Sequence, residues 1–150
     1  MKLELKIKNF ILIVSLILFA WSCETTSNEY EEVPLDVSGN WEIVKVSRNG
    51  VEITSLMDFT QFKLNLNNDG SYSIDNYLPF VVKERSGRWE VDDPNYPFRL
   101  FFYDNNGANK ITSSFYYPPV GGVRQLSLTF PTGCYSNTYT YVFKRVTTKY

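Results

Sequence analysis

The chain has 150 residues, of which 43% are hydrophobic, 17% aromatic and 21% charged. This balance excludes a disordered chain and fits one globular domain. The 15 basic and 16 acidic residues give a formal net charge of -1, so no basic excess indicates nucleic-acid binding. The sequence contains no histidine, which excludes Ser-His and Cys-His nucleophilic catalysis and histidine metal sites. We therefore expect no enzyme, no catalytic residue, no metal and no cofactor.

The first 22 residues have the pattern of an export signal. Lys2, Lys6 and Lys8 precede an apolar run at residues 10–21, as in the charged and apolar regions of a signal peptide. The run falls short of the roughly 20 residues that a membrane-spanning helix needs. An uncleaved anchor is the alternative.

The sequence LFAWSC at residues 18–23 resembles the lipobox of bacterial lipoproteins, with Ser22 before Cys23 and Ala20 where the family usually has leucine. The resemblance implies that cleavage precedes Cys23, which is acylated and becomes the new N-terminus. The expected partner is then the lipid bilayer. The expected location is the Gram-negative cell envelope, with the outer membrane favoured over the inner and the leaflet left open. A secreted form without lipid is a further alternative.

Residues 24–36 read ETTSNEYEEVPLD, which is too polar to pack a core. We expect a lipidated flexible tether over 23–36 and a folded domain over 37–150. Acylation of Cys23 leaves Cys134 without a cysteine partner, and we expect burial of Cys134 between strands.

From Val37 onward, short segments with period-two alternation are separated by turn signals, which predicts an all-β domain. A short helical turn is expected within 55–59, and residues 78–84 extend a strand or form one of their own. The expected turns are Asp69-Gly70, Asn106-Gly107, Gly121-Gly122 and Thr132-Gly133. The expected strands are 40–48, 60–67, 71–77, 87–91, 98–103, 110–116, 124–130 and 138–146.

Eight sequential strands with tight turns favour an antiparallel up-and-down barrel, because closing the sheet removes its exposed edges. A β-sandwich is the alternative, since periodicity does not determine the order of strands that are not neighbours in the chain.

Gly39-Asn40-Trp41 resembles the opening of the lipocalin-like (calycin-type) domains found in small Gram-negative lipoproteins, many of unknown function, and the resemblance covers residues 36–146. It implies that Gly39 lets the chain pack across the barrel floor, that Trp41 fills this floor, and that a basic residue of the last strand lies against the indole. Arg145 has the parity for that position. In the alternative, Trp41 is an ordinary core residue and Arg145 a surface charge.

The interior of an eight-stranded barrel is either filled by side chains or holds one small ligand, and both remain open here. A ligand pocket would open at the end away from Trp41 and Arg145. Its candidate lining is Phe62, Tyr72, Phe102 and Phe115. Alternation directs nine rings inward: Trp41, Phe62, Tyr72, Trp89, Phe102, Phe115, Phe130, Tyr141 and Phe143.

Tyr116 and Tyr117 precede Pro118-Pro119, and tyrosine next to stiff proline favours a preorganised binding surface. Alternatively, these tyrosines cover a barrel mouth and the prolines end strands. We expect a membrane-anchored envelope lipoprotein that binds a small apolar or glycan-type ligand. The alternative is a protein-interaction or inhibitor/immunity-type module with a solid barrel and an envelope protein as its partner.

Overall fold

A computed structural model describes residues 32–76, 84–133 and 136–146. The chain divides into two compact units, Met1–Glu32 and Val33–Tyr150. The expected signal peptide, Cys23 and the tether up to residue 31 lie outside the described residues, as do Cys134 and the expected element at 78–83. In the described part of the chain, no helix has the length and apolar character that crossing a bilayer requires.

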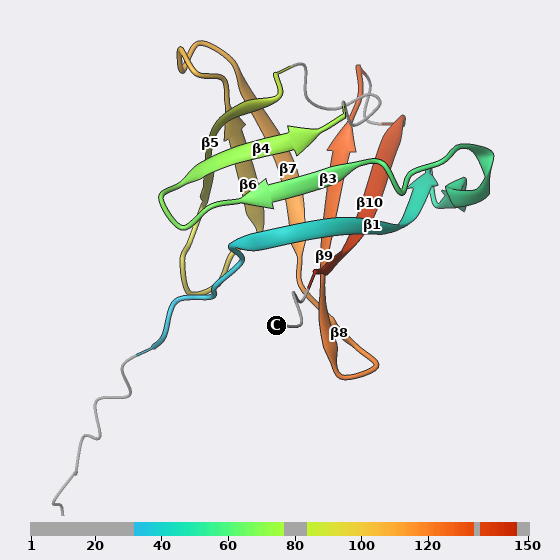
Figure 1. Ribbon diagram of the computed structural model, residues 1–150, viewed down its shortest axis with the longest axis horizontal. Helices are drawn as coiled ribbons and strands as arrows, with labels where there is room; N and C mark the ends of the chain where they lie inside the picture. The colour runs from blue at the N-terminus through green and yellow to red at the C-terminus, as the bar shows by residue number, and fades with distance from the viewer. Residues whose placement is uncertain (1–31, 77–83, 134–135, 147–150) are drawn as a thin grey trace, which may run out of the picture. The chain divides into compact units, whose positions relative to one another are not determined.

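The second unit is built of antiparallel β-strands (Figure 1). Two strands of two residues, β2 (Val51–Glu52) and β8 (Pro119–Val120), pair with β1 and β9, and η1 (Thr54–Leu56) is a short 3-10 helix. The eight main strands are β1 (Gly39–Arg48), β3 (Lys63–Leu66), β4 (Ser71–Asp75), β5 (Ser86–Val91), β6 (Arg99–Tyr103), β7 (Lys110–Tyr116), β9 (Val123–Pro131) and β10 (Thr138–Arg145).

These eight strands form a closed barrel. They are hydrogen-bonded in the order β10-β1-β3-β4-β5-β6-β7-β9, and β9 also pairs with β10. The sheet therefore closes on itself, as the predicted up-and-down barrel requires, and the β-sandwich alternative is wrong. Closure leaves no unpaired edge along the ring of strands, which is the physical reason for expecting a barrel.

Strand boundaries differ from the expected ones where side chains bond to the backbone. The strand expected from Thr60 begins at Lys63, because the backbone and hydroxyl of Thr60 both donate hydrogen bonds to Asp58 and the Phe62 N–H donates to the Phe59 carbonyl at 3.1 Å. These bonds form a turn in place of a strand.

A register shift between Ile43 and Lys45 interrupts the pairing of β1 with β10. It breaks the alternation of β1, since Ile43 and Val46 are both buried while Val44 is exposed. A bulge of this kind adds one residue to one strand, and a simple count of alternating positions does not reveal it.

The inward side chains predicted by alternation form the core. Phe62 and Trp89 are half-buried against it. The other seven predicted rings are buried: Trp41, Tyr72, Phe102, Phe115, Phe130, Tyr141 and Phe143.

The barrel has two ends, which we call the floor and the rim. The floor contains the start of β1 at Gly39, the 92–98 loop between β5 and β6, the β8–β9 turn and the end of β10 at Arg145. The antiparallel register places these segments together, since Gly39 pairs with the end of β3 and Trp41 with Arg145. The rim contains η1 and the 104–109 turn between β6 and β7.

Gly87 on β5 offers a direct test of the barrel wall where β5 lies between β4 and β6. A Cβ atom at this position would lie 2.0 Å from the Tyr103 carbonyl oxygen and 2.8 Å from Cε1 of Tyr72. We expect Gly87→Ala to lower the free energy of unfolding by about 1 to 3 kcal/mol, because an overpacked core must shift its backbone. Urea denaturation measures the change.

The exposed neighbouring position supplies the control. Ser86→Ala is expected to change the stability by no more than about 0.5 kcal/mol. Equal stability of the Gly87→Ala variant and the unmodified protein would show that the close approach of Gly87 to Tyr72 on β4 and to Tyr103 on β6 is not as described.

Candidate functional site

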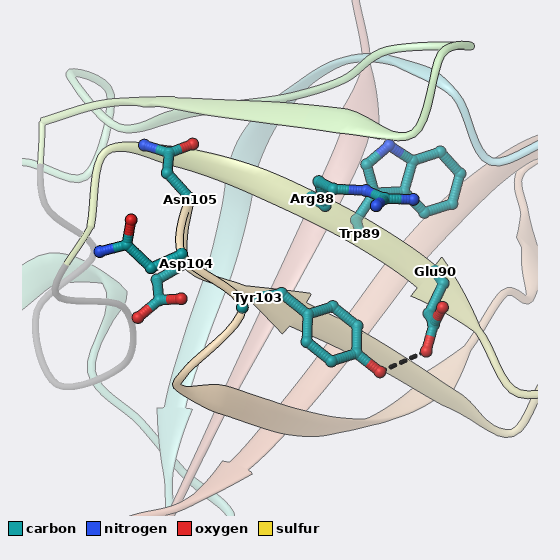
Figure 2. A pocket seen from close by; sticks show the side chains of 8 residues that line it. Arg88, Trp89, Glu90, Tyr103, Asp104 and Asn105 are labelled. Carbon is teal, nitrogen blue, oxygen red and sulfur yellow. Dashed lines mark hydrogen bonds between the residues drawn. The ribbon is translucent and has the colours of Figure 1, made fainter.

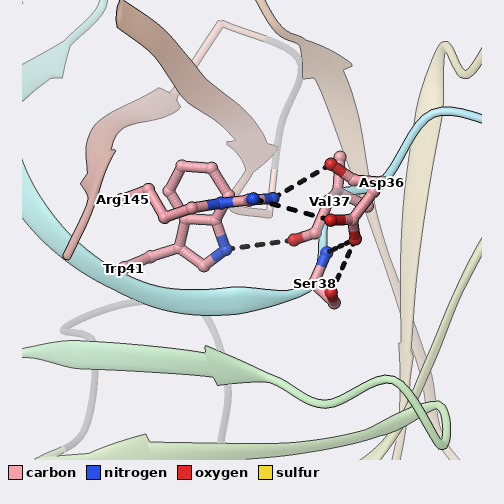
Figure 3. A network of polar contacts seen from close by, with 5 residues as sticks. All are labelled: Asp36, Val37, Ser38, Trp41 and Arg145. Carbon is pink, nitrogen blue, oxygen red and sulfur yellow. Dashed lines mark hydrogen bonds and ion pairs between the residues drawn. The ribbon is translucent and has the colours of Figure 1, made fainter. Parts of the chain in front are cut away.

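The floor is closed by a cation-π contact between the first and last strands. Arg145 and Trp41 are paired in the register of β1 and β10, and the guanidinium carbon lies 5.1 Å from the centroid of the Trp41 ring (Figure 3). Trp41 is fully buried and Arg145 half-buried. The contact implied by the lipocalin resemblance is therefore present, and Arg145 is not a freely solvated surface charge.

Gly39 makes room for this contact. Its φ of +135° disfavours residues with a side chain, and a Cβ atom there would lie 3.3 Å from Nε of Arg145. That Nε atom is buried and has no hydrogen-bond partner among the residues that the structure describes. The arginine side chain thus lies directly against the glycine backbone, in agreement with the role that the resemblance implies for Gly39.

Asp36 connects the floor to the segment that precedes β1. Arg145 Nη2 donates to the Asp36 carbonyl at 3.0 Å, and Nη1 lies 3.5 Å from Oδ2. Ser38 donates to the other carboxylate oxygen from both its hydroxyl and its backbone. The Ser38 hydroxyl is the largest of the interactions that hold the pKa of Asp36 below its usual value, and the nearby Arg145 acts in the same direction.

The expected flexible tether ends earlier than Asp36. Leu35 packs against the core and its N–H donates to the Pro94 carbonyl at 2.8 Å. Val37, which is buried, accepts a hydrogen bond of 3.1 Å from Nε1 of Trp41. Local polarity alone did not indicate these contacts, because they depend on backbone groups that approach one another only in the folded barrel.

The predicted interior ligand residues pack on one another. Tyr72 meets Phe102 edge to face at 5.1 Å between ring centroids, and Phe102 lies 6.2 Å from Phe130. The ring contacts continue from Phe130 to Tyr141 at 6.2 Å. These rings occupy interior space that a ligand would need, and they have the T-shaped or tilted geometry that aromatic pairs prefer.

The six predicted ligand-binding residues are not gathered at one place. Phe62 lies beside Phe59 near the rim, with ring centroids 5.9 Å apart, whereas Phe115 is near the floor and contacts Tyr117 at 6.0 Å. The ring centroid of Tyr117 also lies 5.9 Å from that of Trp41. The neighbouring Tyr116 is 68% exposed to solvent. Phe62 and Phe115 therefore lie toward opposite ends of the barrel, because β7 runs toward the floor and carries Phe115 with it. Ligand binding at any of the six residues stays a prediction.

The structure instead has a pocket of about 310 Å³ on the outer wall of the barrel (Figure 2). We call it the wall pocket. It extends from the outward side chains of β5 and β6 to the turn that follows β6. Its lining residues are Arg88, Trp89, Glu90, Tyr103, Asp104, Asn105, Asn106 and Gly107.

Hydrogen bonds hold the wall pocket in shape. Tyr103 donates its hydroxyl proton to Glu90, from the neighbouring strand. Asp104 accepts hydrogen bonds from the Asn109 side chain at 2.6 Å and from the Ala108 backbone at 2.8 Å, and the Asn109 amide is the main reason that the pKa of Asp104 is low. These bonds order the turn, while the exposed Arg88 and Glu90 side chains remain accessible to a ligand.

An aromatic strip continues beside the wall pocket along the outer face of β6. Lys110 Nζ lies 3.6 Å from the centroid of Phe101 and 5.5 Å from that of Tyr103. The strip thus places the rings of Phe101 and Tyr103 beside the Lys110 ammonium group. The Glu90 carboxylate and the side-chain amides of the adjoining turn are in the wall pocket next to it. Together they offer packing to an apolar face of a ligand and directional hydrogen bonds to its edge.

The sequence reasoning did not identify the wall pocket, because it searched the inward face of each strand. The alternate positions of the same strands, which point outward, did indicate this site. Arg88 and Glu90 on one predicted strand, and Phe101 and Tyr103 on the next, share the outward face beside the predicted Asn106-Gly107 turn.

The family model described as "Domain of unknown function (DUF5004)" matches residues 22–144. No curated protein and no solved structure matches the chain. Within the described ranges, no three acidic or cysteine side chains are grouped so as to hold a metal ion.

Arg145 is the residue with which to test the floor. We expect Arg145→Ala to lower the free energy of unfolding by about 1 kcal/mol, since a cation-π contact contributes about 0.5 to 2 kcal/mol. Thermal and urea unfolding measure the loss. The control is Lys144→Ala, which removes an exposed cation at the adjacent position and is expected to cost less than about 0.5 kcal/mol. An unchanged melting point for Arg145→Ala would contradict the role given to the floor contact.

Proposed function

The chain thus belongs to the DUF5004 family, and we propose that it is a lipid-anchored envelope protein whose lipocalin-like barrel binds a glycan-type ligand in the wall pocket. The observation that carries the proposal is the lining of this pocket. A tyrosine ring there adjoins a guanidinium, two carboxylates and two side-chain amides.

The wall pocket suits a sugar better than an apolar molecule. The apolar C–H face of a pyranose packs against an aromatic ring such as that of Tyr103, while its hydroxyls both donate and accept hydrogen bonds. Glu90 and Asn105 supply acceptors, and Arg88 and Asn105 supply donors. Hydrogen bonds to charged groups are the stronger ones. The volume of about 310 Å³ is at the lower end of the roughly 300–1,000 Å³ of ligand pockets, which favours a short saccharide.

The anchor part of the proposal rests on Cys23. The family match begins at Ser22, the residue before the proposed acylated cysteine, so the charged and apolar residues before it are not part of the shared domain. This is the boundary that a removable leader predicts. The proposed location is the Gram-negative cell envelope, with the outer membrane favoured.

The alternative function is a protein-interaction or inhibitor/immunity-type module. Two observations favour it. The rings of Tyr72, Phe102 and Phe130 pack against one another inside the barrel. Exposed apolar residues such as Phe98 and Tyr116 lie near the floor. Sugar binding at the wall pocket distinguishes the two proposals, because an interaction module does not require it.

Sugar binding can be tested by saturation-transfer NMR with a panel of mono- and disaccharides. We expect transfer to at least one sugar, and a loss of affinity of about tenfold in Arg88→Ala and in Tyr103→Ala, equivalent to about 1.4 kcal/mol. Tyr116→Ala, which removes an exposed tyrosine outside the pocket, should bind as the unmodified protein does. Absence of transfer to every sugar, or equal losses in the three variants, would reject the pocket.

The anchor has an independent test by fractionation of cells that express the full chain. We expect the unmodified protein in the membrane fraction and Cys23→Ser outside it, since that variant lacks the acylated thiol. Cys134→Ser is the matched control and should stay with the membranes. Retention of Cys23→Ser in the membrane fraction would refute lipidation.

A further inference from the structure

The exposed apolar side chains of the barrel are concentrated at its floor. Of ten large hydrophobic residues that are exposed in the described structure, six belong to segments at this end. We call these six the floor patch: Val33, Tyr96, Phe98, Tyr116, Val120 and Val123. The exposed fractions reach 72% at Phe98 and 86% at Val33, so a large part of their apolar surface contacts solvent.

Backbone pairing brings the segments of the floor patch together. The Phe115 N–H donates to the Phe98 carbonyl at 2.8 Å, which sets Tyr116 beside the 92–98 loop. Val120 and Val123 face each other across the β8–β9 turn. β8 pairs only with β9 among the described strands, so this hairpin extends beyond the ring of eight strands, as Figure 1 shows.

The segment that leads back toward Cys23 leaves the domain at the same end. Leu35 is bonded to Pro94 in the 92–98 loop, and Asp36 is bonded to Arg145 on the floor. Ten positions separate Val33 from Cys23. Ten residues reach at most roughly 35 Å when fully extended, so the anchor limits the distance of Val33 from the headgroup layer, which is about 5 to 8 Å thick on each side of a bilayer. An acylated Cys23 would therefore keep the floor patch within reach of the membrane surface.

We propose that the floor patch inserts into the interfacial layer of the membrane that holds the lipid anchor, so that the barrel stands on its floor. This inference rests on the lipidation of Cys23 in the proposed function. Tyrosine and phenylalanine rings suit the boundary between headgroups and acyl chains, and a protruding hairpin with Val120 and Val123 near its tip enters that layer more easily than a flat sheet face does.

The charges around the floor patch are compatible with this arrangement. Arg99 and Arg124 are exposed beside it and can bond lipid phosphates. Asp92 and Asp93 are also exposed there, but their carboxylates accept backbone hydrogen bonds, Asp92 from Phe98 and Arg99 and Asp93 from Asn95. These hydrogen bonds direct both carboxylates toward the loop backbone, where they keep their negative charge, and Arg124 donates to the Tyr117 carbonyl at 3.0 Å. Each guanidinium group has five N–H donors, so both arginines still have donors for a lipid phosphate.

The test uses the full lipidated chain in a Cys134→Ser background, reconstituted into phosphatidylethanolamine/phosphatidylglycerol vesicles. An environment-sensitive fluorophore is attached at Val120→Cys in the floor patch, or at Leu56→Cys as the matched control. Leu56 is an equally apolar position, 77% exposed, on η1 at the rim. Lipids brominated near the headgroup serve as quenchers.

We expect the label at position 120 to emit at shorter wavelength in vesicles and to be quenched about twofold more than the label at position 56. A Phe98→Ser substitution in the patch should reduce the quenching at position 120. Equal quenching at both positions would overturn the inference. A blue shift at position 120 that appears in detergent without vesicles and increases with protein concentration would also overturn it, because another copy would then cover the patch.

Failure of the anchor looks different from failure of the patch. Without lipidation the chain does not float with the vesicles at all, which overturns the anchor and the inference that depends on it. A chain that floats while the label at position 120 stays unquenched leaves the anchor intact and rejects only the insertion of the floor patch.

Discussion

The pairing of β1 with β10 joins the two ends of the sheet, and the rest of the barrel depends on that junction. The contact of Arg145 with Trp41 lies at its floor end. An up-and-down barrel forms neighbouring hairpins from local contacts, but its final pairing connects the first and last strands and must overcome the entropy of closing a long loop. The pairing of β1 with β10 is among the longest in the barrel. Asp36 extends the junction by holding the preceding segment against Arg145.

The floor was predictable because the resemblance to lipocalin-like domains implied its three residue types, and the parity of the last strand then selected Arg145. Gly39 and Trp41 begin the first strand, and Arg145 has the parity to meet the indole once the strands are antiparallel. The bonds from Arg145 and Trp41 to the backbone of residues 36 and 37 were not predictable. They depend on the path of a polar segment whose composition resembles that of a linker.

Alternation predicted the eight strands but not every boundary. It is a property of backbone pleating, so it identifies Phe102 and Tyr141 as core residues without knowledge of their neighbours. It is insensitive to side-chain bonds such as that of Asp58 with Thr60, and to the bulge in β1. It also does not say whether inward rings surround a cavity, since this depends on distances across the barrel. In the folded protein Tyr72, Phe102 and Phe130 meet one another.

The wall pocket, where we propose that a ligand binds, is separate from the residues that stabilise the barrel. Its rim-side lining comes from exposed turn residues, Asn105 to Gly107, that contribute no side chain to the hydrophobic core. Substitution of these residues is therefore expected to carry little penalty to folding, as surface loops on a rigid scaffold generally allow. A change in this exposed turn would alter the proposed ligand site, while the aromatic interior and the floor keep the barrel folded.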